Sequence, residues 1–593
     1  MCGLFLTSRP EEFGNHWQDQ VCSYLRHRGP DAQGSKIRSG VGAVHTRLAV
    51  IGLGHEGAQP MSSIDEEDVL VYNGEIVNYA VIAKQKGIRA GSDTRLLLNL
   101  LAKGEFETLA NLRGMFAFVY WNSRTRTITA MRDRYGVKPL FVLHHSGGGI
   151  SFSSEMRPLL SHPDARSLDP VGLAHFLAEG HTGQTSTIVQ NIRKLSPGHR
   201  YTWQVDSEGR VSQERQFPIG AGTWSRMSVA DALTDSVTAN LVADVEVGVF
   251  LSGGVDSTLI AALASREKSD LQAFTLGFPE SPGNDETEIA RHNASLMGLR
   301  HHVVDVHSHE LSQIAREIVN TTGEPLGDAA VLPLAVLAQK AREHVPVVLA
   351  GEGADEIFGG YRRYRLDNWV SRSPSIMPHG FIEALSRRRG PSRQSRSFEA
   401  MLWGRKRGFQ AHSALLTGEY PTIIQAAPGP GGIALAERIA NWDAVDPVFG
   451  SRALAYDRSI WLPNTYLEKT DRASMLTGLE VRVPFLDPAV VSSVSARDLN
   501  NQTKIPLREL LSELVPTHRL PNTKKGLAVD VPALLQGGLA APYAYEVNDS
   551  GSILANTFGR KAQLSIGQRA EISPNLAFRI AQLGLWQEIE SSA

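Results

Sequence analysis

The second residue of the chain is a cysteine, Cys2, and its position permits nucleophilic chemistry. Removal of the initiator Met1 leaves Cys2 at the N-terminus, with a free α-amino group beside its thiol. An α-amino group has a pKa of roughly 7.7–8.0, so an appreciable fraction is uncharged at neutral pH. Because this amine can accept the thiol proton, nucleophile and base are joined in one residue. If Met1 is removed, Cys2 is a candidate nucleophile, and its position alone leaves a chance occurrence open.

A glycine-rich segment in the middle of the chain has the composition of a phosphate-binding loop. Residues 252–257 (SGGVDS) follow an apolar stretch, 245–251, that is expected to be a strand, and a helix is expected next. Glycines let the backbone approach phosphate, and a helix N-terminus offers unpaired N–H groups to an anion. The Lys-Ser/Thr pair of a P-loop does not follow, so this is a different phosphate motif.

Acidic residues follow a later expected strand, 345–350, in the sequence AGEGADE at 350–356. Ligands of open parallel sheets bind beyond the carboxyl ends of the strands. The carboxylates of Asp256 and Asp355 are therefore predicted to meet over the same phosphates. Two carboxylates beside a polyphosphate are a common way to hold Mg²⁺.

The composition and charge of the chain are those of an ordinary globular protein. Its 593 residues indicate more than one domain, because single cores stop growing near about 250–300 residues. A net charge of −2 gives no reason to expect nucleic acid or an anionic membrane as a partner. No transmembrane stretch or signal peptide is visible, and the two cysteines can stay reduced, so a cytoplasmic location is expected.

The pattern of elements changes along the chain and predicts an α/β protein of two domains. Short strands are expected through the first ~200 residues, at 41–51, 69–72, 115–121, 127–132, 139–143 and 150–153. A polar, Gly-rich segment at 206–223 is expected to be a linker between domains 2–205 and 224–593. Strands then alternate with helices, which favours a parallel sheet: strands at 245–251, 271–276, 302–306 and 345–350, with helices at 258–264, 286–296 and 334–342. The remainder, from about 361, is predicted to be mostly helical.

Several short segments together resemble a known family. Cys2 and the segments 27–31 (HRGPD), 45–51 (HTRLAVI), 72–79 (YNGEIVNY) and 92–94 (SDT) resemble the glutaminase domain of class II glutamine amidotransferases. Segment 252–257 resembles the pyrophosphate loop of ATP pyrophosphatases. The chain is thus similar, from Cys2 to about Gly526, to glutamine-hydrolysing asparagine synthetases.

This resemblance implies a fold and a reaction. The fold would be an N-terminal αββα Ntn-hydrolase sandwich followed by a doubly wound parallel-sheet synthetase domain of the adenine nucleotide α-hydrolase type, with a largely helical C-terminal part. The first domain would hydrolyse glutamine, and ammonia would pass through an internal tunnel. The second would use ATP and Mg²⁺ to activate a carboxylic acid as an acyl-adenylate, which ammonia converts to an amide, AMP and pyrophosphate. A homodimer is the common form in the family.

The resemblance also assigns roles to residues of the glutaminase domain. Cys2 would be the nucleophile, and the Asn73 side chain and the Gly74 N–H would form the oxyanion hole. Arg47 would bind the glutamine α-carboxylate as a bidentate fork, and Asp93 would bind the α-amino group.

In the synthetase domain the implied roles concern ATP and its activation. Glu352 would take a proton from the attacking ammonia, and Lys524 would stabilise the adenylate-forming transition state. Asp256 and Asp355 would bind Mg²⁺. The ATP site would comprise Leu251, Ser252, Gly253, Gly254, Asp256, Ser257, Leu276 and Gly351.

The acceptor is implied to be L-aspartate, but one segment departs from the family pattern. Residues 323–333 read GEPLGDAAVLP, with alanine and valine where hydroxyl-bearing residues are usual. A site for a small, doubly charged amino acid needs polar partners. Another carboxylic acid in a natural-product pathway therefore stays open as the acceptor.

Two further alternatives are weighed against the motif residues. One is intramolecular amide formation of the β-lactam synthetase or lasso-peptide cyclase type. Such enzymes often lack the glutaminase nucleophile, so the intact set of Cys2, Arg47, Asn73 and Asp93 argues against it. The other is a catalytically silent binding protein, and the filled motif positions argue against that too.

Overall fold

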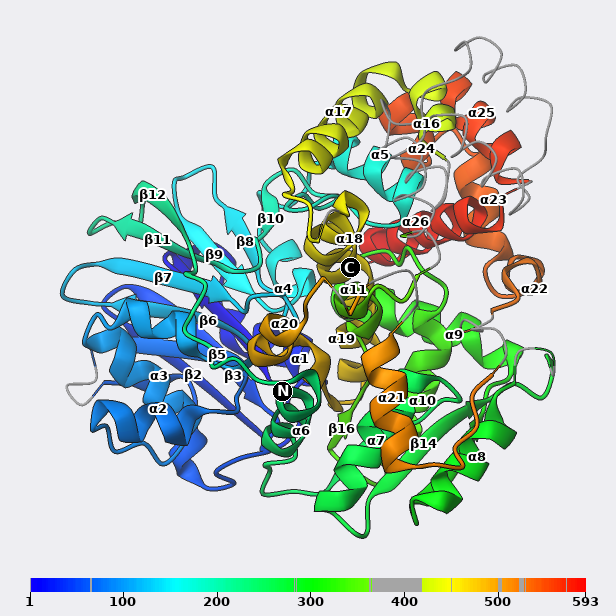
Figure 1. The fold of residues 1–593 in the computed structure, drawn as a ribbon. Helices are drawn as coiled ribbons and strands as arrows, with labels where there is room; N and C mark the ends of the chain where they lie inside the picture. The colour runs from blue at the N-terminus through cyan, green and yellow to red at the C-terminus, as the bar shows by residue number, and fades with distance from the viewer. Residues whose placement is uncertain are drawn as a thin grey trace.

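The computed structural model describes residues 2–63, 67–281, 283, 285–361, 364, 419–449, 451–496, 498–499, 504–521, 527, 529–571 and 573–592. A sheet-rich N-terminal part, blue to cyan in Figure 1, lies beside a green part built on a parallel sheet, and yellow-to-red helices stand against both. Among these residues no helix is both long and apolar enough to cross a membrane.

Two antiparallel sheets form the N-terminal domain. The first has the order β10-β8-β9-β1-β3-β2 and the second the order β12-β11-β7-β6-β5-β4. Strands of the first sheet are β1 (Gly3–Thr7), β2 (Ala32–Arg38), β3 (Val41–Arg47), β8 (Phe141–His144), β9 (Ile150–Ser153) and β10 (Ile192–Lys194). Strands of the second are β4 (Met61–Ser62), β5 (Val69–Ile76), β6 (Gly114–Asn122), β7 (Thr127–Arg132), β11 (His199–Val205) and β12 (Val211–Pro218).

The alternation of side chains along these strands produces four layers. Leu4 and Leu6 of β1 pack with β6 residues such as Trp121 between the two sheets. Phe5, on the opposite face of β1, packs against α1. Helices thus cover the outer face of each sheet: α1 (Trp17–Leu25), α4 (Met156–Leu160) and α5 (Pro170–Glu179) on the first, and α2 (Tyr79–Lys86) and α3 (Asp93–Ala102) on the second. The predicted αββα sandwich is confirmed.

The second domain is built on a parallel sheet of order β15-β14-β13-β16-β17. Its strands are β13 (Val247–Phe250), β14 (Gln272–Gly277), β15 (Arg300–Asp305), β16 (Val347–Leu349) and β17 (Glu480–Arg482). Strands β14 and β15 are added in turn on one side of β13, and the chain then crosses to place β16 on the other side. The order reverses between β13 and β16, and ligands of such sheets bind beyond the carboxyl ends of the strands at a reversal of this kind.

Helices cover both faces of this sheet, so the predicted doubly wound arrangement is confirmed. Val249 faces the cluster that holds α6 and α7, whereas Phe250 faces the cluster that holds α9 and α10. The helices are α6 (Val229–Asn240), α7 (Val255–Glu267), α8 (Thr287–Leu296), α9 (Ser308–Thr322), α10 (Val331–Arg342) and α11 (Ala354–Phe358).

The described part of the C-terminal region is largely helical, as predicted. Its helices are α16 (Tyr420–Ala426), α17 (Pro428–Ala444), α18 (Arg452–Tyr456), α19 (Glu468–Met475), α20 (Pro488–Ser493), α21 (Ile505–Leu514), α22 (Val531–Gln536), α23 (Ala540–Asn548), α24 (Ile553–Phe558), α25 (Arg560–Ala570) and α26 (Pro574–Ser592). A π-helical segment, η6 (Asp457–Leu467), joins α18 to α19.

One sequence expectation is wrong in part. Residues 206–223 were expected to be a linker, but Val211–Pro218 forms β12, which pairs with β11 from Val211↔Val205 to Pro218↔His199. Seven of its eight residues are exposed, because β12 is the edge strand of its sheet. An exposed edge strand carries polar residues at most positions, so it lacks the apolar alternation by which strands are predicted.

Candidate functional site

The nucleophile and the expected oxyanion-hole residues come from different sheets of the sandwich. Cys2 directly precedes β1, in the interior of the first sheet, and Asn73 and Gly74 lie on β5 of the second. The nitrogen of Cys2 donates a hydrogen bond of 2.9 Å to Oδ1 of Asn73. Stacking of the two sheets therefore places the future α-amino group against the Asn73 side chain.

Asn73 and Gly74 have the features that an oxyanion hole requires. The Asn73 side chain is fully buried, and its Nδ2 has no hydrogen-bond partner among the described residues. A buried donor without a partner is costly, and a developing oxyanion would satisfy it. Gly74 has φ +147°, and a Cβ there would lie 2.1 Å from the Met115 carbonyl oxygen. Only glycine fits this backbone position.

The Cys2 thiol needs a base. Cys2 is 7% exposed, and burial raises the pKa of its thiol. The thiol is therefore protonated at neutral pH, and a thiolate forms only if a neighbouring group takes the proton. The α-amino group of the same residue is the expected base if Met1 is removed.

The two residues expected to hold the glutamine backbone are both buried and fixed by hydrogen bonds. Arg47, at the end of β3, donates to the carbonyl oxygens of Gly54 at 2.8 Å and Ile51 at 3.2 Å, and also to that of Gly52. Asp93 accepts from the Tyr72 hydroxyl at 2.7 Å and from the Ile76 N–H at 3.2 Å. Burial raises the pKa of Asp93, so a bound ammonium group would stabilise its ionised form.

A buried ion-pair network joins the two domains next to Cys2. Arg28 is fully buried; its Nε donates to the Cys2 carbonyl oxygen at 3.2 Å. Its Nη1 lies 2.8 Å from Glu155 and 2.8 Å from Asp471 of α19. The carboxylates hold the pKa of Arg28 above its usual value despite burial. Cys2, the expected nucleophile, is therefore connected through one side chain to helix α19 of the second domain.

A cavity lies along this domain interface. The N-terminal domain lines it with Arg28, Arg132, Glu155 and Lys194, and the C-terminal part with Asn464, Glu468, Asp471 and Arg472. The sequence assigned no role to Arg28 or to Asp471. Two charged residues 443 positions apart carry no signal in one sequence that they pair.

The glycine-rich loop of the synthetase domain connects the carboxyl end of β13 to the N-terminus of α7. Ser257 Oγ accepts from the Ser252 N–H at 3.0 Å, and Ser252 Oγ accepts from the Gly254 N–H at 3.1 Å. The Gly253 N–H donates to a carboxylate oxygen of Glu286 at 3.1 Å. This loop thus already presents a backbone donor to an anionic group, as a pyrophosphate site would.

The carboxyl ends of neighbouring strands hold the remaining expected ATP-site residues. Leu251 directly follows β13, and Leu276 is the last residue but one of the adjacent strand β14. Both side chains are buried. Gly351 follows β16, and a Cβ there would lie 3.0 Å from Cβ of Asp256 and 3.1 Å from the Ser257 nitrogen. The end of β16 therefore packs directly on the first turn of α7.

Asp256 and Asp355 meet, as the sequence predicted. Lys504 Nζ lies 2.5 Å from Asp256 Oδ2 and 2.6 Å from Asp355 Oδ1. Two carboxylates that converge on one ammonium form a donor set of the charge and type that suits a divalent cation. The sequence gives no signal for this role of Lys504, because its partners lie 248 and 149 positions away.

A second cavity contains part of the segment that departs from the family pattern, and one of its lining residues, Lys469, is a charged neighbour of Glu352. Thr470 Oγ1 donates to Glu352 Oε1 at 3.3 Å, and burial raises the pKa of Glu352 although Lys469 opposes this. Lys469 Nζ lies 3.4 Å from Asp328 Oδ2. The second cavity is lined by residues that include Glu324, Leu326, Asp328, Val331, Lys469 and Arg472. Lys524 lies outside the described residues.

Comparison with known proteins identifies the family. Residues 228–571 match the asparagine synthase family, and residues 1–215 match the glutamine amidotransferase domain. A putative glutamine-hydrolysing asparagine synthetase of Mycobacterium tuberculosis is 33% identical, with 92% of this chain and 90% of that protein covered. Asparagine synthetase 1 of Bacillus subtilis is 29% identical over 86% of this chain and 83% of its own.

A fungal relative has a different name. The amidase chry2 of Gibberella zeae is 29% identical, with 58% of this chain and 55% of that protein covered. The two family matches follow one another along the chain in the order of the two domains. The chain therefore belongs to the asparagine synthase family, as a glutamine-hydrolysing carbon–nitrogen ligase of the asparagine synthetase type.

Proposed function

We propose that this protein transfers the amide nitrogen of glutamine to L-aspartate in an ATP-dependent reaction that yields asparagine, AMP and pyrophosphate. The contact of Arg28 with both the Cys2 carbonyl oxygen and Asp471 carries the proposal. It joins the glutaminase nucleophile to the helix whose Thr470 contacts Glu352, so the two reaction centres share one buried network.

In the glutaminase site, the α-amino group of Cys2 takes the thiol proton and the thiolate attacks the glutamine side-chain carbonyl. Asn73 Nδ2 and the Gly74 N–H stabilise the oxyanion. Ammonia leaves when the amine returns the proton, and water then hydrolyses the thioester to glutamate. Arg47 and Asp93 orient the glutamine through its α-carboxylate and α-amino groups.

Ammonia would then cross the domain interface through the cavity beside Arg28 and Asp471. Glu468 and Arg472 line this cavity and also the second cavity, whose lining residue Lys469 is a charged neighbour of Glu352. The shared lining residues support a path between the two centres.

In the synthetase site, the loop at 252–257 would hold the ATP phosphates, and an acceptor carboxylate oxygen attacks the α-phosphorus as pyrophosphate leaves. Asp256 and Asp355 would hold Mg²⁺, which neutralises phosphate charge when bound. Glu352 takes a proton as ammonia attacks the acyl-adenylate, and AMP leaves. Lys524 would stabilise the adenylate-forming transition state. The raised pKa of Glu352 makes it a better proton acceptor than an exposed glutamate.

The second cavity supports aspartate as the acceptor. It offers both an ammonium, Lys469, and a carboxylate, Asp328, which can pair with the α-carboxylate and α-amino groups of an amino acid. Leu326 and Val331 line the same cavity and favour a larger, less polar acid. Amidation of such an acid is the second candidate function.

Two properties complete the proposal. Both cysteines are free thiols, which is consistent with a reducing compartment such as the cytoplasm. The partners would be small molecules, with a homodimer as the assembly.

The test is release of AMP and pyrophosphate from Mg-ATP with ammonium chloride and L-aspartate, which bypasses the glutaminase. Aspartate-dependent release with formation of asparagine is expected. L-Glutamate and D-aspartate are matched controls and should release little. No release with L-aspartate, while glutamine hydrolysis is still measurable, would reject aspartate and direct the search to larger carboxylic acids.

A further inference from the structure

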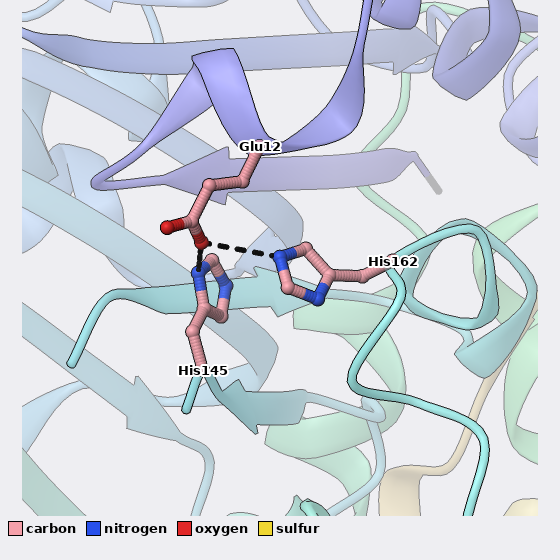
Figure 2. Close-up of side chains that lie close together, drawn as sticks. All are labelled: Glu12, His145 and His162. Carbon is pink, nitrogen blue, oxygen red and sulfur yellow. Dashed lines mark hydrogen bonds and ion pairs between the residues drawn. The ribbon is translucent and has the colours of Figure 1, made fainter. Parts of the chain in front are cut away.

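Three metal-ligating side chains gather at the opposite end of β1 from Cys2. Glu12 lies on η1 (Pro10–Phe13), a 3-10 turn shortly after β1. His145 follows β8, and His162 lies two residues beyond α4. Figure 2 shows the Glu12 carboxylate directed at both imidazole rings. Neither the glutaminase nor the synthetase mechanism uses any of these residues.

The geometry brings one carboxylate oxygen against one nitrogen of each ring. Glu12 Oε2 lies 2.5 Å from His145 Nδ1 and 3.2 Å from His162 Nε2. The ligand atoms of all three residues lie within 4.8 Å of one another. With metal–ligand bonds of 2.0–2.2 Å, ligands of a tetrahedral zinc ion are about 3.3 Å apart. Small side-chain movements would therefore seat one ion among these atoms.

The rings are buried and held in place. His145 is 5% and His162 is 3% exposed, and the ring centroids are 4.1 Å apart with Phe13 against both. His145 Nε2 lies 2.8 Å from Ser151 Oγ, which leaves Nδ1 turned toward Glu12.

The surroundings supply the outer partners that metal sites use. Arg9 Nη1 lies 2.5 Å from Glu12 Oε1, so one carboxylate oxygen is paired and Oε2 is left for the ion. A ring that binds metal through one nitrogen donates the other N–H to an oxygen. Ser151 Oγ is positioned to accept from His145. In the structure the Asp164 N–H donates to His162 Nδ1 at 3.1 Å. When His162 binds the ion through Nε2, its Nδ1–H needs an acceptor instead, and Asp164 Oδ2 lies 3.7 Å from Nδ1.

We propose that Glu12, His145 and His162 bind one divalent transition-metal ion, zinc by its preference for this ligand set, and that the ion fastens η1 to the segments after β8 and α4. Two imidazoles and one carboxylate suit zinc better than magnesium or calcium, which prefer oxygen ligands. A water molecule completes the coordination. The site is structural, and it is separate from the Asp256–Asp355 pair.

The test measures zinc retained by the full chain. Protein treated with EDTA receives excess zinc chloride, is desalted and is analysed for metal; about one zinc per chain is expected. Glu12→Gln and His162→Gln should lose the retained zinc and the zinc-dependent rise in Tm. His16→Asn, an exposed histidine four residues from Glu12, is the matched control and should behave as the wild type. Equal zinc retention by the Glu12→Gln protein and the wild type would overturn the proposal.

A second measurement distinguishes zinc bound at this site from zinc bound by a cysteine thiol. It uses the wild-type chain, so it does not require that any variant folds. Cobalt(II) added to the wild-type chain should give visible absorption of a nitrogen–oxygen site without the near-ultraviolet bands of thiolate ligation. X-ray absorption of the zinc-loaded protein should show two imidazole ligands and no sulfur. A sulfur ligand would assign the ion to Cys2 or Cys22. No retained zinc at all would leave Glu12, His145 and His162 as a hydrogen-bonded cluster and reject the metal site.

Discussion

Lys504 Nζ lies 2.5 Å from Asp256 Oδ2, although 248 residues separate the two in the chain. The same ammonium lies 2.6 Å from Asp355 Oδ1. Gly360 leaves the room for this arrangement, because a Cβ there would lie 1.7 Å from the Asp355 oxygen. A cationic side chain thus lies against both of the carboxylates proposed to hold Mg²⁺.

Replacing Lys504 with methionine should make stability depend on Mg²⁺. Without the ammonium, two carboxylates that lie close together lose the cation they share, at a cost of about 3 kcal/mol. Mg²⁺ would neutralise them, so MgCl₂ should raise the Tm of Lys504→Met much more than that of the wild type. Thermal unfolding with and without MgCl₂ measures this. Lys340→Met, on the surface, is the control, and an equal Mg²⁺ effect in all three proteins would contradict the proposed metal ligands.

The variant Cys2→Ala should separate the two reactions. Glutamine hydrolysis should be abolished because the nucleophile is gone, whereas synthesis from ammonium chloride should continue. Glutamate and AMP release are assayed in parallel. Cys22→Ala, which removes the other buried thiol, should retain both activities. Equal loss of both activities in Cys2→Ala would mean that the centres are not separable.

The Asn73→Ala variant tests the unpaired amide. Loss of one oxyanion donor lowers kcat by about 100- to 1000-fold, so glutaminase activity should fall by that factor while ammonia-dependent synthesis is unchanged. Asn99→Ala, on α3, is the matched control. A change in KM for glutamine without a change in kcat would indicate that Asn73 binds substrate and does not stabilise the oxyanion.

The sequence predicted those features that local patterns encode. The interior strands β6 and β7 contain either alternating or continuous apolar residues, and the predicted bounds are close to those observed. Strand β12 was assigned to a linker, because an exposed edge strand has a polar sequence. Strand β17, only three residues long, gave no periodicity to detect.

Within the candidate sites, the motif residues were predictable and their partners were not. Asp256 and Asp355 follow different strands of one parallel sheet, so general sheet geometry places them together. The pairing of Arg28 with Asp471 depends on how two domains pack, and no local pattern carries that information. The Glu12–His145–His162 cluster likewise arises from three segments joined only by the fold.

Replacement of Glu352 by glutamine should impair synthesis equally with glutamine and with ammonium. The amide cannot take the ammonia proton, but it keeps the size of the side chain and can accept from Thr470. Formation of the acyl-adenylate should persist, so aspartate-dependent ATP–pyrophosphate exchange is expected to remain near the wild-type rate. Loss of exchange together with synthesis would place Glu352 in substrate binding and not in proton transfer.

Acid should destabilise the glutaminase domain through His45. This residue is fully buried on β3, and burial lowers its pKa to about 3, against about 6.5 in the unfolded chain. Between these values the unfolded state binds the extra proton, so stability falls by up to about 1.4 kcal/mol for each pH unit below about 6.5. His45 Nε2 lies 3.0 Å from the Tyr72 carbonyl oxygen, and a glutamine amide can donate there instead. His45→Gln should therefore show a weaker loss of Tm between pH 6.5 and 4.5 than the wild type. The exposed His16→Asn should follow the wild-type curve, and identical curves for all three proteins would remove His45 as a source of acid sensitivity.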